Sequence, residues 1–255
     1  MNVALSARPF SVRLRFHGDL SFFLGSAKAE PLIEKRLREK TSVKDAIESC
    51  GVPHTEIDLI VANGAPLTFS HHLMSDEEID IYPVPAPPAL FPAVRLQQRG
   101  LKRFVADGHL GKLARDLRLL GFDVAYDNNA TDEALLAMTG QEERALLTRD
   151  RRLLMRGIVR DGYCPRSPLH EDQTLEVIKR FELKQAIAPW TRCLRCNGVL
   201  SRVEKSEVQN RLEPLTRLYY EDFRRCLTCG QIYWSGSHFA KLQARINFFW
   251  KSPPS

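Results

Sequence analysis

Short apolar runs alternate with helical segments in the middle of the chain. Residues 104–106 (FVA) end at Asp107, residues 122–126 form a second run, and residues 145–147 (ALL) are followed closely by Asp150. Between the first two runs, leucine and alanine recur at helical spacing, at positions 110, 113, 114, 117 and 120. Short apolar strands that alternate with amphipathic helices are typical of βαβ units. This region is therefore predicted to be an α/β domain with a parallel sheet.

Two of these strands are followed by an aspartate. The carboxyl ends of parallel strands meet at one edge of a sheet, where ligands bind. Asp107 and Asp150 are therefore expected to lie near each other, although they are far apart along the chain. Carboxylates that meet without a basic partner repel each other unless a hard cation neutralises them. This pattern favours a metal-dependent hydrolase.

Each acid also has a purely structural interpretation. Asp150 can cap the helix that follows it, and Asp132 with Glu133 suits the positive end of a helix dipole. Asp107 can stabilise a turn at the end of its strand. Three acids at one sheet edge nevertheless favour a shared site.

The helix predicted between residues 110 and 120 has a charged face. Its members are Lys112, Arg115, Asp116 and Arg118. Such a face is typical of contact with solvent. The alternative is contact with phosphate groups, because the helix starts next to Asp107.

The N-terminal third consists of short alternating runs. The predicted strands are 11–16, 20–24, 57–61 and 79–84. A helix is predicted from about residue 43, with Thr41 or Ser42 as its cap and Gly51 near its end. Asn63-Gly64 indicates a tight turn. This order of elements predicts a small β-grasp module within residues 1–86.

Five prolines lie between Pro83 and Pro92. Proline fixes φ and removes a hydrogen-bond donor, so the stretch is predicted to be a stiff, extended linker at a domain boundary. We place the linker at residues 87–101, the α/β domain at 102–188 and a last domain at 189–255.

Four of the six cysteines form two Cys-x-x-Cys pairs. They are Cys193, Cys196, Cys226 and Cys229, with 29 residues between the pairs. Two such turns can direct four thiolates at one tetrahedral ion, which predicts a zinc ribbon; redox thiols or disulfides are the alternative. Because cysteine fills all four positions, this zinc would be structural rather than catalytic.

Basic and aromatic residues surround the two cysteine pairs. They are Arg192, Arg195, Arg202, Arg224, Arg225, Tyr219, Tyr220, Tyr233 and Trp234. This mixture suits stacking on single-stranded RNA. Packing of the aromatic rings onto the α/β core is the alternative, above all for Trp234.

Composition adds only coarse limits. The 255 residues carry a net charge of +6 and are 44% apolar. This is compatible with a folded core and an anionic polymer as partner. No apolar run approaches the ~18 residues of a membrane helix, and no secretory signal is evident. We therefore expect a cytoplasmic protein without a membrane partner, in which Cys50 and Cys164 stay reduced.

The N-terminal module resembles the ubiquitin-like fold of small sulfur-carrier proteins over about residues 10–86. The resemblance rests on residues 42–47 (SVKDAI), 61–64 (VANG) and 79–84 (IDIYPV). Those carriers end in a Gly-Gly tail, whereas this chain continues with Pro85 and further residues. Sulfur transfer is therefore disfavoured, and the module is expected to dock or pack, with a protein as a possible partner.

Residues 102–240 resemble the Mut-seven C-terminal ribonuclease-like family, a branch of the PIN-like nucleases. The resemblance rests on residues 104–107 (FVAD), 110–123 (LGKLARDLRLLGFD), 126–128 (YDN) and 146–151 (LLTRDR), together with the cysteine pairs. It implies a Rossmann-like PIN sheet with helices on both faces. It also implies an RNase site that binds a divalent metal through Asp107, Asp132 and Asp150. PIN nucleases commonly hold a fourth carboxylate, for which Asp127, Glu133 and Asp172 are open candidates.

Phosphodiester hydrolysis suits these residue types, since Mg²⁺ or Mn²⁺ held by carboxylates screens the phosphate and activates water. Arg149 and Lys112 are candidates to contact the scissile phosphate, although Arg149 could equally be solvated. His109 is a further candidate, as a general base or as an ordinary strand-end residue. The predicted function is a metal-dependent ribonuclease. The alternative is an RNA-binding or adaptor protein that does not cleave.

Overall fold

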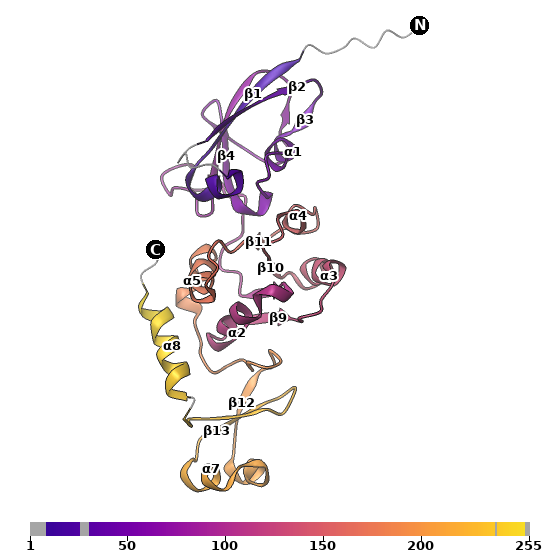
Figure 1. Ribbon diagram of the computed structural model, residues 1–255. Coiled ribbons are helices and arrows are strands. Elements are labelled where there is room, and N and C mark those ends of the chain that lie inside the picture. Colours follow the sequence, from indigo (N-terminus) through magenta and orange to yellow (C-terminus); the bar gives the residue numbers. More distant parts are fainter. Residues whose placement is uncertain (1–8, 26–30, 238, 253–255) are drawn as a thin grey trace. The chain divides into compact units, whose positions relative to one another are not determined.

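The computed structural model describes residues 9–25, 31–237 and 239–252. The chain divides into two compact units. Unit 1 comprises Met1–Gln98 and Thr148–Cys164, and unit 2 comprises Arg99–Leu147 and Pro165–Ser255. Figure 1 labels the helices and strands of both units and colours them in the order of the sequence. In the part of the chain that the structure describes, no helix is long and apolar enough to cross a membrane.

Unit 1 contains a five-stranded sheet in the order β2-β1-β7-β4-β5. Its strands are β1 (Phe10–Phe16), β2 (Leu32–Leu37), β4 (Ile57–Ala62), β5 (Ala65–Leu67) and β7 (Glu77–Pro83). The central pair β1 and β7 is parallel, and the remaining pairs are antiparallel. Two further short strands, β3 (Thr41–Ser42) and β6 (His72–Leu73), pair antiparallel with each other. Strand β3 directly precedes α1 (Val43–Glu48), and β6 follows β5 in the sequence. The 3₁₀ helix η2 (His54–Glu56) precedes β4.

Local signals in the sequence place most of these elements. Val12, Leu14 and Phe16 alternate along β1 and are fully buried. The Ser42 side chain caps α1 by accepting a hydrogen bond from the Asp45 N–H at 3.0 Å, as predicted. Asn63 and Gly64 form the turn between β4 and β5 with φ values of 52° and 76°. Such a two-residue turn needs positive φ at both positions.

The strand predicted at residues 20–24 is wrong. These residues belong to the 3₁₀ helix η1 (Gly18–Leu24), in which Leu20 and Phe23 are buried. A spacing of three places both side chains on the same side of a 3₁₀ turn. The second strand of the sheet is β2, which pairs antiparallel with β1 at the edge of the sheet.

The proline-rich stretch and the residues after it are bonded to β4 and η2 of unit 1. The Asp58 carboxylate is fully buried; it accepts from the backbone N–H of Ala86 at 3.0 Å and forms an ion pair with Arg95 at 3.4 Å. Gln97 donates from Nε2 to the His54 carbonyl at 2.9 Å. The proline-rich stretch therefore packs on its own unit. The domain boundaries stay a prediction.

The second segment of unit 1, Thr148–Cys164, packs on the first. It contains α4 (Arg151–Leu154) and β11 (Gly162–Tyr163). The buried Glu56 accepts from the Cys164 N–H at 2.7 Å, and His54 Nε2 lies 2.8 Å from the Val159 carbonyl oxygen. Arg151 donates to the Phe23 carbonyl at 2.7 Å. The same guanidinium lies 5.3 and 5.0 Å from the ring centres of Phe22 and Phe23.

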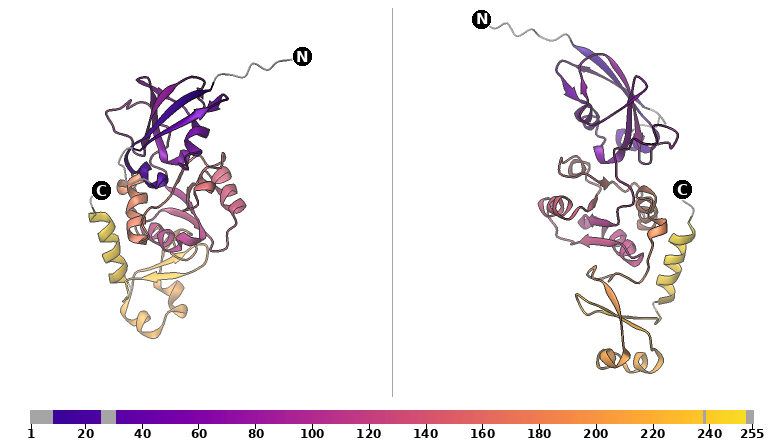
Figure 2. Two further views of the ribbon diagram at one scale, coloured as in Figure 1. Left: turned by 45° about the horizontal axis from the view of Figure 1, so that its top comes forward. Right: turned by 180° about the vertical axis from the view of Figure 1, so that it is seen from behind.

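Unit 2 contains three parallel strands in the order β10-β8-β9. They are β8 (Arg103–Ala106), β9 (Asp123–Tyr126) and β10 (Ala145–Leu147). The helices of this part are η3 (Gly108–Leu110), α2 (Gly111–Leu119), α3 (Asp132–Glu142), α5 (His170–Arg180) and η4 (Lys184–Ala186). Figures 1 and 2 show α3 and α5 on opposite sides of these strands. The predicted parallel α/β arrangement is confirmed.

Three phenylalanines form the centre of the core of unit 2. Phe104 contacts Phe122 and Phe181 edge to face, with ring centres 6.4 and 5.1 Å apart. All three rings are at most 2% exposed. Helix α5 begins at His170. Its first turn carries Glu171 and Asp172, which suit the positive end of a helix.

The end of the chain forms a ribbon and a helix within unit 2. The ribbon has the order β12-β13-β14, antiparallel throughout. Its elements are β12 (Leu200–Val203), α6 (Lys205–Val208), η5 (Gln209–Arg211), α7 (Pro214–Tyr219), β13 (Phe223–Cys226) and β14 (Ile232–Trp234). A small core of Val208, Leu212, Phe223 and Ile232 holds it together. Helix α8 (Phe239–Lys251) follows the ribbon.

Candidate functional site

Two of the candidate carboxylates lie at the carboxyl ends of parallel strands in unit 2. Ala106, the last residue of β8, pairs with Leu147 of β10 on one side and with Tyr126 of β9 on the other. Asp107 directly follows β8, and its N–H donates to the Leu147 carbonyl at 3.0 Å. Asp127 directly follows β9. Asp107 and Asp127 therefore occupy matching positions at the ends of neighbouring parallel strands.

Small residues keep these strand ends close together. A Cβ at Gly108 would lie 2.8 Å from the Asn128 carbonyl oxygen, and one at Gly111 would lie 2.5 Å from the Tyr126 hydroxyl oxygen. The Tyr126 hydroxyl donates to the Gly108 carbonyl at 2.9 Å. The loops after β8 and β9 are thus joined at the point where Asp107 and Asp127 stand.

The remaining predicted acids stand at helix starts. Thr131 caps α3 by accepting from the Ala134 N–H, so Asp132 and Glu133 lie in the first turn. Asp150 caps α4, and its Oδ1 accepts from the N–H groups of Arg152 at 2.8 Å and Leu153 at 3.2 Å. The capping role weighed for Asp150 and the first-turn position weighed for Asp132 and Glu133 are therefore confirmed, and both leave a metal role open.

The predicted site residues are divided between the units. Asp107, Asp132 and Lys112 belong to unit 2, whereas Asp150 and Arg149 belong to unit 1. The convergence of the three carboxylates stays a prediction. Lys112 and Arg149 are exposed, as residues that contact a substrate phosphate must be. Asp172 accepts a hydrogen bond from the Ser167 hydroxyl at 2.9 Å in the turn before α5.

The four cysteines of the ribbon form a cluster that can hold a metal ion. Their Sγ atoms all lie within 4.8 Å of one another, and none of the four is in a disulfide. Cys193 Sγ lies 3.7 Å from Cys229 Sγ, and Cys196 Sγ lies 3.4 Å from Cys226 Sγ. Tetrahedral zinc with Zn–S bonds of about 2.3 Å places its sulfur atoms about 3.8 Å apart. The cluster therefore fits a structural metal ion such as zinc.

The two cysteine turns have the same backbone geometry. In the first, the Asn197 N–H donates to the Cys193 carbonyl and the Cys193 N–H to the Gly198 carbonyl. In the second, the Gly230 N–H donates to the Cys226 carbonyl and the Cys226 N–H to the Gln231 carbonyl. Asn197 and Gly230, the matching residues, both have φ of 70°. Two equivalent turns are what a closed four-cysteine site needs.

The thiols of this cluster differ in acidity. Burial opposes ionisation of Cys226, but the backbone N–H groups of Cys229 and Thr228 lower its pKa to about 6. Burial raises the pKa of Cys196 to about 12, and hydrogen bonds with the other thiols add to the rise. At least one thiolate is thus favoured near neutral pH before any metal binds, which suits capture of a cation.

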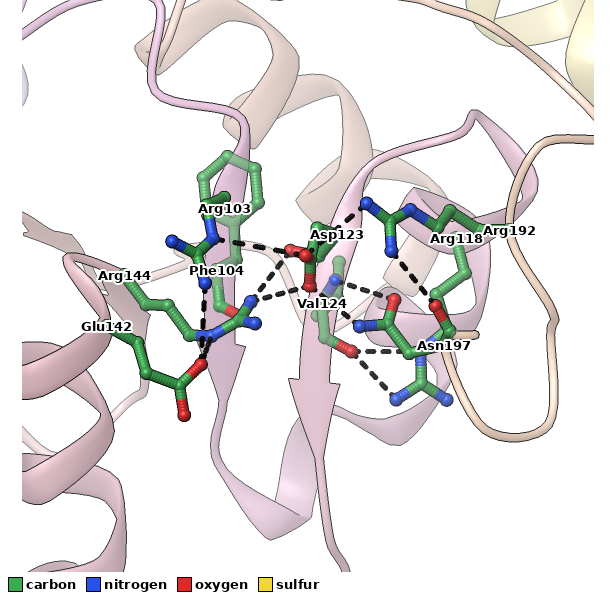
Figure 3. Close-up of polar contacts among 9 residues, drawn as sticks. All are labelled: Arg103, Phe104, Arg118, Asp123, Val124, Glu142, Arg144, Arg192 and Asn197. Atoms are coloured by element: carbon green, nitrogen blue, oxygen red, sulfur yellow. Dashed lines mark hydrogen bonds and ion pairs between the residues drawn. The ribbon is translucent and has the colours of Figure 1, made fainter. Parts of the chain in front are cut away.

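A polar junction joins the first cysteine turn to the sheet (Figure 3). Asn197 Nδ2 donates to Asp123 Oδ1 at 2.7 Å, and the Val124 N–H donates to Asn197 Oδ1 at 2.9 Å. The buried Arg118 of α2 donates to the Val124 carbonyl at 2.8 Å and to the Arg195 carbonyl at 3.2 Å. The Asn197 side chain thus binds the first two residues of β9 and joins the first cysteine turn to that strand.

Asp123 is the charged centre of this junction. Arg144 donates to its Oδ1 at 2.6 Å, and Arg192 lies 3.4 Å from its Oδ2. Burial alone would raise the pKa of Asp123, but hydrogen bonds from Arg144 and Asn197 hold it below its usual value. Asp123 begins β9, whereas the predicted carboxylate site is at the strand ends. This cluster is therefore structural.

Two charges on α2 are buried, against the expectation of a solvent-facing side. Asp116 is 4% exposed and Arg118 is 5% exposed. Arg245 of α8 binds Asp116 with two hydrogen bonds of 2.6 Å, and His170 Nδ1 lies 2.9 Å from Asp116 Oδ2. Sequence reasoning missed both roles because the partners are remote along the chain. Lys112 and Arg115 on the same helix are exposed, as predicted.

Comparisons with known families cover nearly all of the described chain. Residues 10–88 match the Mut7-C ubiquitin model, and residues 102–246, more than half of the chain, match the Mut7-C RNAse domain model. No curated protein and no solved structure matches the chain. The four-cysteine ribbon lies inside the second match. The chain belongs to the Mut7-C RNAse domain family and carries the ubiquitin-like domain of that family at its N-terminal side.

Proposed function

We propose that this protein is a metal-dependent ribonuclease with a PIN-like nuclease core. The observation that carries the proposal is the pairing of β10, β8 and β9, since Asp107 and Asp127 directly follow two of these parallel strands and Asp150 lies three residues after the third. Residues past the carboxyl ends of parallel strands line the usual ligand-binding edge. Membership of an RNAse-domain family supports the same reaction class.

Asp107, Asp132 and Asp150 would hold Mg²⁺ or Mn²⁺, and Asp127 is the favoured fourth carboxylate because of its place beside Asp107. Hard cations take carboxylate oxygens, and Mg²⁺ retains several waters, so three carboxylates suffice. Such an ion, when bound, would supply charge that screens the phosphate and lowers the pKa of water. Zinc is the ion we propose for the four cysteines.

The protein's own side chains would bind and orient the RNA. Arg149 can donate two parallel hydrogen bonds to a phosphate, and Lys112, in the first turn of α2, supplies a point charge. Neither residue would move a proton. Their part is to hold the scissile phosphate in line with the attacking water, which is a large share of phosphoryl-transfer catalysis.

Degradation of a labelled RNA with Mn²⁺ tests the proposal. Asp107→Asn and Asp150→Asn should each lower the rate by more than about 100-fold, because even loss of a residue that supports a metal ligand costs about 10–100-fold. Asparagine also caps helices, so Asp150→Asn keeps α4 intact. Asp76→Asn is the matched control, since Asp76 accepts from the Ser11 N–H in unit 1.

Two outcomes would contradict the proposal. Cleavage that survives the Asp107→Asn, Asp150→Asn double substitution would exclude these carboxylates as the site. Absence of cleavage by the unaltered protein, together with retained RNA binding, would favour the RNA-binding adaptor.

A further inference from the structure

A cavity of about 510 Å³ lies in unit 2 beside the ribbon. Its lining comes from α2, from the first cysteine turn, from β14 and from the start of α8. The aromatic and charged residues of the lining are Trp190, Tyr233, Trp234, Phe239, Arg115 and Arg195. Its size falls in the range of about 300–1,000 Å³ that is typical of ligand pockets. None of the acids assigned to the nuclease site lines it.

The aromatic rings of this cavity are held in place. Trp190 and Phe239 stack with ring centres 4.7 Å apart and planes 16° apart. The Trp190 carbonyl accepts from Arg224 at 2.9 Å, which anchors the backbone at this residue. The Tyr233 hydroxyl accepts from the Leu194 N–H at 3.0 Å. These rings need no rearrangement before a flat ligand stacks on them, which lowers the cost of binding.

Trp234 forms an exposed part of the same wall. Its side chain lies against Gly236, where a Cβ would come within 2.5 Å of the indole Nε1. The residue is 38% exposed, so packing onto the core, the alternative weighed above, accounts for only part of its surface. Exposed indole surface in a cavity that also holds stacked rings is typical of a stacking site for bases.

The charge of the cavity is purely positive. Arg115 and Arg195 are exposed, and neither guanidinium makes a hydrogen bond or ion pair with any residue in the described part of the chain. No carboxylate belongs to the lining. A second cavity of about 350 Å³ shares Trp190, Tyr233, Trp234 and Phe239, but its charged residues are of both signs: Glu204, Glu221, Asp222, Arg202 and Arg224. The aromatic wall therefore borders a purely basic cavity and a cavity of mixed charge.

We propose that the 510 Å³ cavity binds one unpaired nucleotide of an RNA strand. The base would stack on the aromatic wall, and Arg115 and Arg195 would bind its phosphate. The identity of the ligand as RNA rests on the proposed function, but the cavity itself does not. An acidic peptide would satisfy the two arginines without using four aromatic residues, so the nucleotide matches more of the lining.

Fluorescence anisotropy of a labelled single-stranded RNA tests this site, with zinc-loaded full-length Asp107→Asn protein so that binding is measured apart from cleavage. The double variant Arg115→Ala, Arg195→Ala and the single variant Trp234→Ala should each weaken binding by about tenfold or more, since stacking of one base commonly contributes about 5–150-fold. Arg217→Ala on α7 removes an exposed arginine outside both cavities and should bind normally. Zinc content and circular dichroism verify the fold of each variant.

Unchanged binding in both cavity variants would overturn the inference. So would displacement of the RNA by oligoglutamate at the same charge concentration, because the site would then recognise charge alone. The cavity variants could lose RNA binding while the unaltered protein, which retains Asp107, shows no cleavage. This result would support nucleotide binding in the cavity and contradict only the proposed nuclease activity.

Discussion

Asn197 is a single residue that performs two tasks. Its φ of 70° allows the first cysteine turn to close, and its side-chain amide joins that turn to Asp123 and Val124 of β9. Glycine and asparagine adopt this conformation most readily. Glycine fills the matching position in the second turn, Gly230, where no such junction exists among the described contacts. The asparagine at the first turn is thus explained by the junction.

Asn197→Gly should separate the two tasks, because glycine keeps the backbone conformation and removes the amide. Val124 N–H then loses its acceptor in a half-buried position. We expect a loss of about 1–3 kcal/mol in the free energy of unfolding, measured by urea denaturation with zinc present. Asn247→Ala is the control, since Asn247 is exposed on α8. Equal stability of Asn197→Gly and the unaltered protein would mean that the junction contributes nothing.

At the scale of the element, α4 is a helix of four residues whose placement depends on other parts of unit 1. Asp150 caps it, and Arg151 attaches it to the carbonyl of Phe23 and to the rings of Phe22 and Phe23 in η1. So short a helix has little stability of its own. The ubiquitin-like module therefore stabilises the segment that presents Asp150, which gives a physical reason for the fusion of the two.

Arg151→Ala should loosen this segment without unfolding the sheet of unit 1. The substitution removes a hydrogen bond and a cation–π contact, which together contribute about 1–3 kcal/mol. Hydrogen exchange measured by mass spectrometry should become faster in residues 148–164 and stay unchanged in β1 and β7. Arg152→Ala, which alters the exposed neighbour, is the control. Unchanged exchange in residues 148–164 of the Arg151 variant would show that its contacts are dispensable.

The sequence predicted the elements whose signals are local. The cap at Ser42, the Asn63-Gly64 turn and the apolar strand 145–147 each depend on neighbouring residues only. Strand β2 escaped prediction because all six of its residues are half-buried or exposed, so no apolar period marks it. Residues 20–24 are too few to distinguish a strand from a 3₁₀ turn by their pattern.

The functional region was predictable to a similar limit. The cysteine spacing specifies its own cluster, and the strand-end position of Asp107 follows from the apolar run before it. The burial of Asp116 depends on Arg245, which is 129 residues away. The cavity beside the ribbon combines residues from α2, β14 and α8. The local sequence pattern predicts neither the burial of Asp116 nor the cavity, because residues remote in the sequence form both.

At the scale of the whole molecule, the chain passes between its units three times. It leaves unit 1 after Gln98, returns at Thr148 and leaves again after Cys164. The two family matches divide the chain differently: the first ends at residue 88, and the second begins at residue 102. A compact unit of this protein is therefore not a single sequence domain. Removal of residues 1–98 would also remove the partners of residues 148–164.

The four-cysteine ribbon is expected to be the part of the molecule that depends on an external ligand. Its apolar core consists of four buried residues, Val208, Leu212, Phe223 and Ile232, and a core so small rarely stabilises a fold alone. Structural zinc commonly adds about 10–16 kcal/mol in zinc-finger peptides at neutral pH. Coupling to metal is therefore expected to decide whether the ribbon folds.

Removal of zinc by a chelator, or Cys226→Ser, should thus increase hydrogen exchange in β12, β13 and β14. Exchange in β1, β4 and β7 should stay slow, because these strands belong to unit 1 with its own large core. Cys50→Ser, outside the cluster, is the control.

The aromatic wall includes Tyr233 and Trp234 of β14, so RNA binding should weaken when the ribbon unfolds. Slow exchange throughout a metal-free ribbon would contradict the structural role of the ion, and faster exchange in β1, β4 and β7 after metal loss would contradict the restriction of this role to the ribbon.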